Sequence, residues 1–201
     1  MFRIAAAVLM LLLAGCGSDG SDETAAPDPV TVTETLTETA PADPGVECST
    51  SSLRLTLPEP DLPAVVADVR RRVFEAALAC DYETLEQIAL EKGEGFTFSY
   101  GGEASAAEHW RDAEASAAEP KPMRALATIL TLPFTRNEAG SYAWPGAYDE
   151  SPTEADWQAV VDAGLYSAAT IEQMKVQGTG YLGYRTAITP DGDWQFFVAG
   201  D

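Results

Sequence analysis

The feature that most constrains this chain is a short apolar run close to its first residue. Arg3 precedes an uninterrupted apolar stretch of ten residues, Ile4 to Leu13. A helix of that length rises only about 15 Å, whereas the hydrocarbon core of a bilayer is about 30 Å thick. The run is therefore too short to span a membrane. A basic start, a short apolar core and a small-residue ending predict a secretory signal peptide over residues 1–15.

The end of this run carries a more specific pattern. The residues Leu13-Ala14-Gly15-Cys16 resemble the lipobox of bacterial lipoproteins. The resemblance implies that Cys16 is thioether-linked to diacylglycerol, that the signal is cut immediately before it, and that further acylation with fatty acids such as palmitate follows. It implies a domain held outside the cytoplasm on the bacterial cell membrane, with the bilayer as the partner of acylated Cys16. An ordinary secretory signal with an incidental cysteine is the alternative.

Residues 17–46 differ in composition from the rest of the chain. They hold seven acidic residues and four prolines but no basic residue. In the threonine-rich centre, 31–39, only Val32 and Leu36 are large and apolar. Such a segment buries too little surface to offset the entropy lost on ordering. We therefore expect residues 16–46 to be the lipidated cysteine and a disordered tether, and residues 47–201 to form a single domain.

The charge of the whole chain excludes one class of partner. The 201 residues include 32 acidic and 12 basic ones, for a net charge of −20. Proteins that bind nucleic acids use lysine and arginine to displace counterions from the phosphates. We therefore expect no nucleic-acid partner.

Apolar periodicity begins after Pro60 and predicts a helix over residues 62–80. Asp61 is the expected N-cap of this helix, and the arginines at 70–72 are expected on its solvated face. Asp81 has the pattern of a second N-cap, which predicts another helix that ends at Gly93.

Local signals predict most of the remaining elements. Aromatic residues at alternate positions in 95–100 predict a strand. Ser105 and Glu108 have capping-box spacing at the start of a helix. Further elements are expected as helices from Pro122 to Leu130, from Thr153 to Gly164 and over 167–176, and as a short strand over 142–144.

The last residues have the clearest β pattern. Strands over 181–189 and 194–199 flank Pro190-Asp191-Gly192-Asp193, which is typical of a hairpin turn. The order of elements predicts an α+β domain, with N-terminal helices packed on a small antiparallel sheet that ends in a C-terminal hairpin. Because neither face of 194–199 is polar, we expect helix 62–80 to cover one face and later helices the other.

The cysteines predict one covalent cross-link. The chain has three, Cys16, Cys48 and Cys80. If Cys16 is lipidated, two remain in an exported protein, which predicts a disulfide between Cys48 and Cys80. Two isolated cysteines lack the further ligands of a metal site, so no metal is expected.

Few residues are candidates for chemistry. His109, the single histidine, is expected at the surface, and no nucleophile elbow accompanies it. Arg185 lies between aromatic residues and could bind a carboxylate or stack on a ring, or pair with a nearby acid. The ligand-binding candidates are Trp110, Trp144, Tyr184 and Arg185. We expect neither catalytic residues nor a cofactor.

One stretch of the domain resembles a known superfamily. The run from Phe74 to Phe98, with Ala79-Cys80-Asp81 at its centre, resembles the opening of NTF2-like domains, and the chain end after Gly183 resembles that of uncharacterised bacterial exported domains. We therefore expect a membrane-anchored lipoprotein whose domain binds an envelope protein or a small ligand and is not an enzyme. The alternative implied by the resemblance is a carboxylate-dependent hydrolase or isomerase on an NTF2-like cone.

Overall fold

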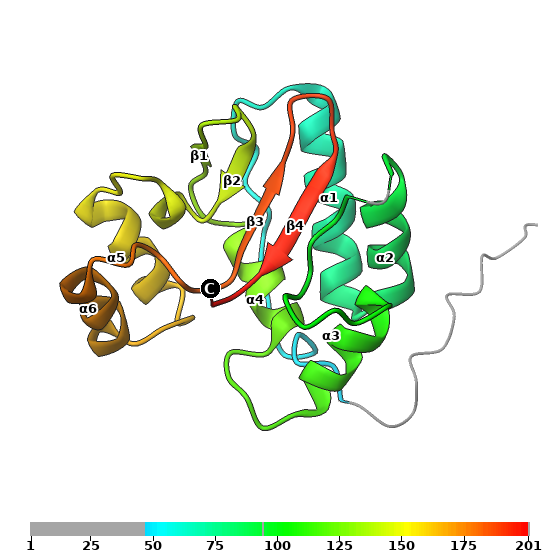
Figure 1. Cartoon of the computed structure of the whole chain (residues 1–201), viewed down its shortest axis with the longest axis horizontal. Coiled ribbons are helices and arrows are strands. Elements are labelled where there is room, and N and C mark those ends of the chain that lie inside the picture. Colours follow the sequence, from blue (N-terminus) through cyan, green and yellow to red (C-terminus); the bar gives the residue numbers. More distant parts are fainter. Residues whose placement is uncertain (1–46, 94, 201) are drawn as a thin grey trace, which may run out of the picture. The chain divides into compact units, whose positions relative to one another are not determined.

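The computed structural model describes residues 47–93 and 95–200, so the predicted signal peptide, Cys16 and the whole predicted tether lie outside the described residues. Within those residues, six α-helices, one 3-10 helix (η1) and a four-stranded antiparallel sheet form an α+β fold, as predicted (Figure 1). The elements are α1 (Ala64–Ala79), α2 (Tyr82–Leu90), α3 (Ala106–Ala115), α4 (Pro122–Ile129), β1 (Thr135–Arg136), β2 (Tyr142–Trp144), η1 (Gly146–Tyr148), α5 (Glu154–Asp162), α6 (Ala168–Gln177), β3 (Arg185–Ile188) and β4 (Trp194–Val198).

The sheet is a meander in which each strand pairs with the next, in the order β1-β2-β3-β4. The predicted C-terminal hairpin is present as β3 and β4, although β3 begins at Arg185, four residues later than the predicted strand. Gly192 in its turn has a φ of +86°, which favours glycine, and a Cβ there would lie 2.6 Å from Val65 Cγ2. The turn therefore needs glycine both for its conformation and for its contact with α1.

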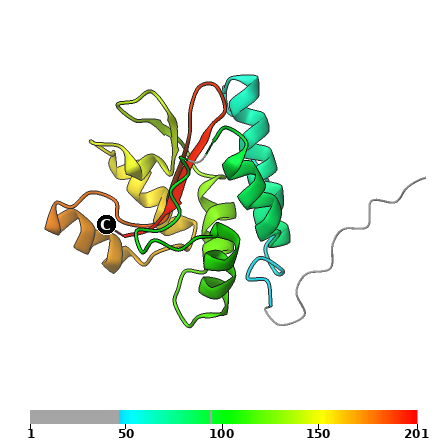
Figure 2. The same cartoon turned by 45° about the vertical axis from the view of Figure 1, so that its right-hand side comes forward.

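The helices α1 to α4 cover the same face of this sheet (Figures 1 and 2). The ring of Trp110 on α3 lies 5.9 Å from that of Trp194 and 6.1 Å from that of Phe197, which places α3 against β4. The opposite face carries Phe196, whose ring centre lies 6.0 Å from that of Tyr148 in η1. The prediction that helices cover both faces is therefore wrong for α3 and α4, which lie on the same face as α1, whereas the short helix η1 contacts the opposite face.

Several helix starts agree with the local signals. The side chain of Asp81 accepts a hydrogen bond from the backbone N–H of Thr84 at 3.0 Å, and that of Ser167 accepts one from Thr170 at 3.1 Å. A capping box joins Thr153 to Asp156 at the start of α5. These starts could be predicted because an N-cap depends on residues only three positions apart.

Two other helix starts differ from the prediction. The N-cap of α1 is Pro63 and not Asp61, and no side chain caps it. At α3, Ser105 accepts from the Glu108 N–H at 3.2 Å, but Glu86 of α2 accepts from the Ala106 N–H at 2.7 Å. A residue from another helix thus supplies the carboxylate that the capping-box pattern assigned to Glu108.

Residues 95–100 do not form the predicted strand. Only Thr97 pairs with the sheet, in a single parallel bridge to Phe196. The ring of Phe96 lies 4.6 Å from that of Trp194, and Phe96 and Phe98 both contact Trp110. The aromatic alternation therefore reflects packing against tryptophans and not a strand ladder.

Arg70 is another departure, because it is buried and not on a solvated face. Its side chain is 3% exposed and donates from Nε to the carbonyl of Leu130 at 3.1 Å and from Nη1 to that of Pro58 at 2.8 Å. Its guanidinium also lies 5.6 Å from the ring centre of Trp144. Burial lowers the pKa of Arg70 to about 10, so it stays charged at neutral pH.

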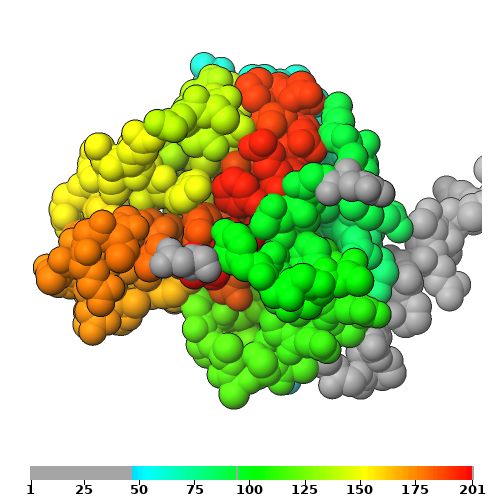
Figure 3. All heavy atoms as spheres, in the orientation of Figure 1, coloured from blue at the N-terminus to red at the C-terminus, as the bar shows by residue number. Residues whose placement is uncertain are grey.

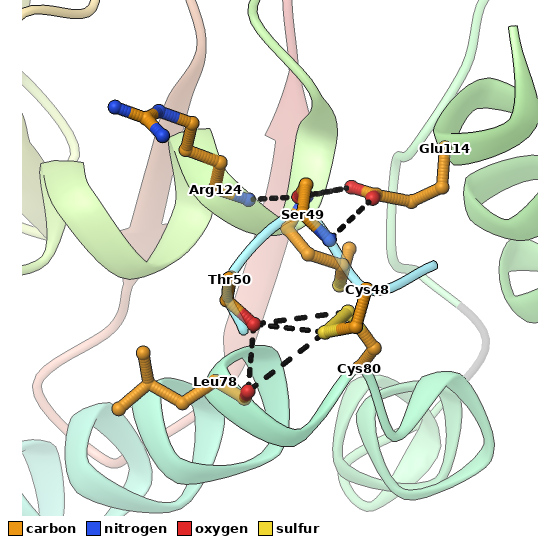
Figure 4. The surroundings of a disulfide bond; sticks show 8 residues. Cys48, Ser49, Thr50, Leu78, Cys80, Glu114 and Arg124 are labelled. Carbon is orange, nitrogen blue, oxygen red and sulfur yellow. Dashed lines mark hydrogen bonds between the residues drawn. A yellow bond between two sulfur atoms is a disulfide. The ribbon is translucent and has the colours of Figure 1, made fainter. Parts of the chain in front are cut away.

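The predicted disulfide joins Cys48 to Cys80, whose Cα atoms are 5.9 Å apart (Figure 4). The next residues are held as well. The Thr50 hydroxyl donates to the Leu78 carbonyl at 2.7 Å, and the Ser49 hydroxyl donates to Glu114 at 3.1 Å. The segment before α1 is therefore tied to the end of α1 and to α3.

Candidate ligand-binding groove

An open groove of about 750 Å³ lies between three segments that are distant in the sequence. Residues 136–139 come from the end of β1 and the following turn, 148–150 from the end of η1, and 179–182 with Arg185 from the approach to β3. Figure 3 shows this side of the molecule, where residues near 150 (yellow) lie next to residues near 175 (orange). The groove can therefore form only when all three segments have folded together.

Arg185 is the buried cation of this groove. It is 8% exposed, and it donates from Nη1 to the Gly183 carbonyl at 3.3 Å and from Nη2 to the Gly200 carbonyl at 2.7 Å. Its guanidinium lies 5.4 Å from the ring centre of Tyr148. Among the described residues, no carboxylate oxygen lies within 4.0 Å of it. Its contacts with these residues are therefore to neutral groups.

Four other basic residues of the domain behave differently. Arg71, Arg72, Arg111 and Lys175 each form an ion pair with a glutamate or aspartate. Such pairing is expected in a chain with a net charge of −20. Arg70 is also buried beside a groove without such a partner in the described part of the chain, but its Nε, Nη1 and Nη2 all donate to carbonyls. Arg185 donates only from Nη1 and Nη2 to the described residues, so it is the stronger candidate for ligand binding.

A second arginine lines the groove at its outer edge. Arg136 is exposed, and it donates to the Tyr142 hydroxyl at 3.0 Å and to the Gly140 carbonyl at 2.8 Å. Its guanidinium lies 4.5 Å from the centre of the Tyr142 ring. These contacts hold Arg136 against β2.

The groove also has an acidic rim, which consists of Glu138, Asp149 and Glu150. Glu138 and Glu150 line the groove together, and interaction with the Glu138 carboxyl raises the pKa of Glu150. Asp149 differs, because hydrogen bonds from the Thr135 hydroxyl and the Ser151 N–H lower its pKa. Across the part of the chain that the structure describes, no group of three or more such side chains is placed to hold a metal ion.

Tyr181 anchors one wall of the groove. Its ring lies 6.0 Å from that of Trp157 and 6.1 Å from that of Tyr166, and it is 3% exposed. A Cβ on Gly183 would lie 2.4 Å from the Tyr181 hydroxyl oxygen, so this wall needs glycine there. The Tyr166 hydroxyl accepts a hydrogen bond from the Tyr184 N–H at 3.0 Å. Tyr181 and Tyr184 are thus held on α5 and on Tyr166, in the connection between α5 and α6.

The two hydroxyl groups of this wall should respond oppositely to removal. The Tyr181 hydroxyl is buried and has no hydrogen-bond partner within residues 47–93 and 95–200, and its burial raises the pKa of Tyr181. We expect Tyr181→Phe to leave the free energy of unfolding unchanged or to raise it by about 1–2 kcal/mol. Tyr166→Phe should lower it by about 1 kcal/mol, because the Tyr184 N–H loses its acceptor. Urea unfolding of both variants measures this, and a larger loss for Tyr181→Phe would contradict it.

The four residues predicted from the sequence do not converge on one site. Trp110 and Tyr184 line a smaller pocket of about 150 Å³, on either side of Phe197. Trp144 is completely buried against Arg70, and only Arg185 lines the large groove. Trp110, which is 1% exposed, and Trp144 therefore serve the core.

His109 lines the smaller pocket, and its Nδ1 lies 3.6 Å from a carboxylate oxygen of Glu103, which is outside that pocket. Sequence reasoning missed the other groove residues, among them Tyr148, Glu138 and Glu150. The one signal for the groove was the scarcity of basic residues, which made Arg185 conspicuous.

No family model, curated protein or solved structure matches the chain. Function is therefore argued from the groove and from the sequence. None of the helices in residues 47–93 and 95–200 is long and apolar enough to cross a membrane. The disulfide is compatible with an exported domain, because such bonds persist in oxidising compartments.

Proposed function

We propose that this chain is an exported bacterial lipoprotein whose domain binds a small ligand in the groove around Arg185. The observation that carries the binding role is Arg185 itself, a buried guanidinium without a carboxylate partner among the described residues. The groove volume of about 750 Å³ falls in the range of small-molecule sites, about 300–1,000 Å³. The lipobox-like Leu13-Ala14-Gly15-Cys16 and the disulfide support export and anchoring.

Two observations favour a small ligand over a protein partner and over catalysis. Among the described residues, the exposed large apolar residues are single and lie on separate segments, Val65, Leu90, Tyr100 and Val176, whereas a protein interface usually has a continuous patch. The one buried carboxylate of the described residues, Glu114, lies outside the groove and accepts hydrogen bonds from Ser49 and the Met123 N–H. It is therefore engaged in holding the fold, which weakens the alternative of a carboxylate-dependent hydrolase or isomerase.

Anchorage can be tested separately from binding. Replacing Cys16 with serine removes the thiol that would be acylated, so the variant should leave the membrane fraction. Fractionation of cells before and after a high-salt wash measures this, with Cys48→Ser as a matched control that keeps Cys16. Full retention of Cys16→Ser on washed membranes would contradict lipid anchorage.

The binding role is tested by filling the groove. Ala139 lines it and is exposed, so Ala139→Trp should fill part of it without entering the core. Ala118, an exposed residue between α3 and α4, supplies the matched control Ala118→Trp. In a thermal-shift screen of anionic, cationic, zwitterionic and neutral small molecules, we expect compounds that stabilise the native chain and Ala118→Trp but not Ala139→Trp. A screen in which no compound shows that difference would overturn the proposed function.

A further inference from the structure

The donors of Arg185 define which part of a ligand this groove can hold. Nη1 and Nη2 each donate to one carbonyl, of Gly183 and Gly200. Nε has no acceptor among the described residues, although a guanidinium carries five N–H donors. The Nε–H and the remaining Nη hydrogens are thus available to the two oxygens of a carboxylate, the geometry that arginine binds best. Tyr148, which packs on the guanidinium, keeps its plane fixed.

The charge around Arg185 favours an anion with a single negative charge. Glu138, Asp149 and Glu150 line the same groove. A phosphate, with its charge of nearly −2 at neutral pH, would be repelled by these carboxylates more strongly than a carboxylate would. The groove is therefore better matched to a carboxylate than to a phosphate.

The acidic rim favours a cation at the other end of the ligand. Glu138 and Glu150 are both exposed and line the groove together, and interaction with Glu138 raises the pKa of Glu150. An ammonium group between them would relieve the repulsion of their charges and could donate to both, since it carries three N–H donors. The buried guanidinium and this pair of carboxyls line one groove, so a single ligand can meet both.

From this arrangement we propose that the groove binds a zwitterion of the amino-acid or short-peptide class, with its carboxylate on Arg185 and its ammonium between Glu138 and Glu150. This inference rests on the proposed function, because it assigns a class of ligand to the same groove. It assigns no reaction: the groove recognises both ends of the ligand and releases it unchanged.

The test compares one dipeptide with two capped forms. Glycyl-phenylalanine carries both charges, its C-terminal amide lacks the carboxylate, and its N-acetyl form lacks the ammonium. Calorimetric titration of the full chain at low ionic strength should show that the free dipeptide binds at least about tenfold more tightly than either capped form. Equal affinity for the dipeptide and its amide would overturn the assignment of Arg185.

Variants assign each preference to its residues. Arg185→Gln should abolish the preference for the free carboxylate and keep that for the free ammonium, whereas the double variant Glu138→Gln and Glu150→Gln should do the reverse. Arg54→Gln, at an exposed arginine outside the groove, is the matched control for the loss of one cation. Because Glu138 and Glu150 are exposed, their double variant keeps the test informative if Arg185→Gln fails to fold. The inference would be overturned if these variants kept both the preference for the free carboxylate and the preference for the free ammonium.

Failure of this inference can be told apart from failure of the groove as a binding site. If all three forms bind equally and Ala139→Trp abolishes their binding, the zwitterionic ligand is wrong and the groove remains the site. If binding is unchanged in Ala139→Trp, both proposals are wrong. If the dipeptide does not bind at millimolar concentration, the zwitterionic ligand is wrong, and the small-molecule screen decides on the groove.

Discussion

Truncation of the chain after Asp193 is expected to abolish cooperative unfolding of the domain. It removes β4 and with it the antiparallel partner of β3. It also removes Trp194 and Phe197, both 1% exposed and both in contact with Trp110. Burial of each large aromatic side chain is worth about 2–3 kcal/mol, whereas a whole domain is stable by only about 5–15 kcal/mol. Circular dichroism and thermal melting of the truncated chain, produced without lipid, measure this.

A chain that lacks residues 19–43 is the control for this truncation, and we expect it to melt like the native chain. Trp194→Ala offers a milder version, because it keeps the backbone of β4 but loses the aromatic contacts and the hydrogen bond from Nε1 to the Thr186 hydroxyl at 2.6 Å. We expect it to lower the free energy of unfolding by about 3–5 kcal/mol. A cooperative melt of the truncated chain near the native temperature would show that the hairpin is peripheral.

The second large effect is expected from the disulfide. Cys48 and Cys80 are separated by 32 positions, and closing a loop of that size stabilises a fold by roughly 3.5–4 kcal/mol in the chain-entropy model. The double variant Cys48→Ser and Cys80→Ser should lose up to that amount. The hydrogen bonds of Ser49 and Thr50 to Glu114 and Leu78 remain, so the segment before α1 should stay docked. Denaturant unfolding of both chains measures the difference.

The double variant provides its own control, since a reducing agent should destabilise the native chain and leave the variant unchanged. A native chain whose unfolding midpoint does not move on reduction would contradict the prediction. Free-thiol labelling of the denatured, unreduced protein gives an independent check, in which neither Cys48 nor Cys80 should react.

Much of the fold could be predicted because its signals are local. The N-caps at Asp81, Thr153 and Ser167 need only residues within one helical turn, and the turn around Gly192 needs only its own tetrapeptide. The errors arose where a distant partner decided the outcome. Arg70 lies in a charged run, yet carbonyls near Pro58 and Leu130 and the ring of Trp144 bury it.

The groove was beyond sequence reasoning for the same physical reason. Its walls come from segments around residues 136, 150 and 180, and no local pattern brings them together. The aromatic alternation at 95–100 shows the converse, because a strand-like pattern was satisfied by contacts with Trp110 and Trp194. Arg185 could be named as a candidate from its rarity in the chain, but Tyr148 as its neighbour could not.

The position of the disulfide has a mechanical consequence. Cys80 lies at the junction of α1 and α2, so a pull applied to the chain before Cys48 passes through the sulfur atoms directly to that junction. Residues 49–79, which include all of α1, are then bypassed by the load and cannot be unravelled one after another from the N-terminal side. A translocating protease that pulls on the chain before Cys48 would have to detach α2 from the domain or break the S–S bond first. After reduction of the disulfide, α1 would be the first helix to unfold under the same pull.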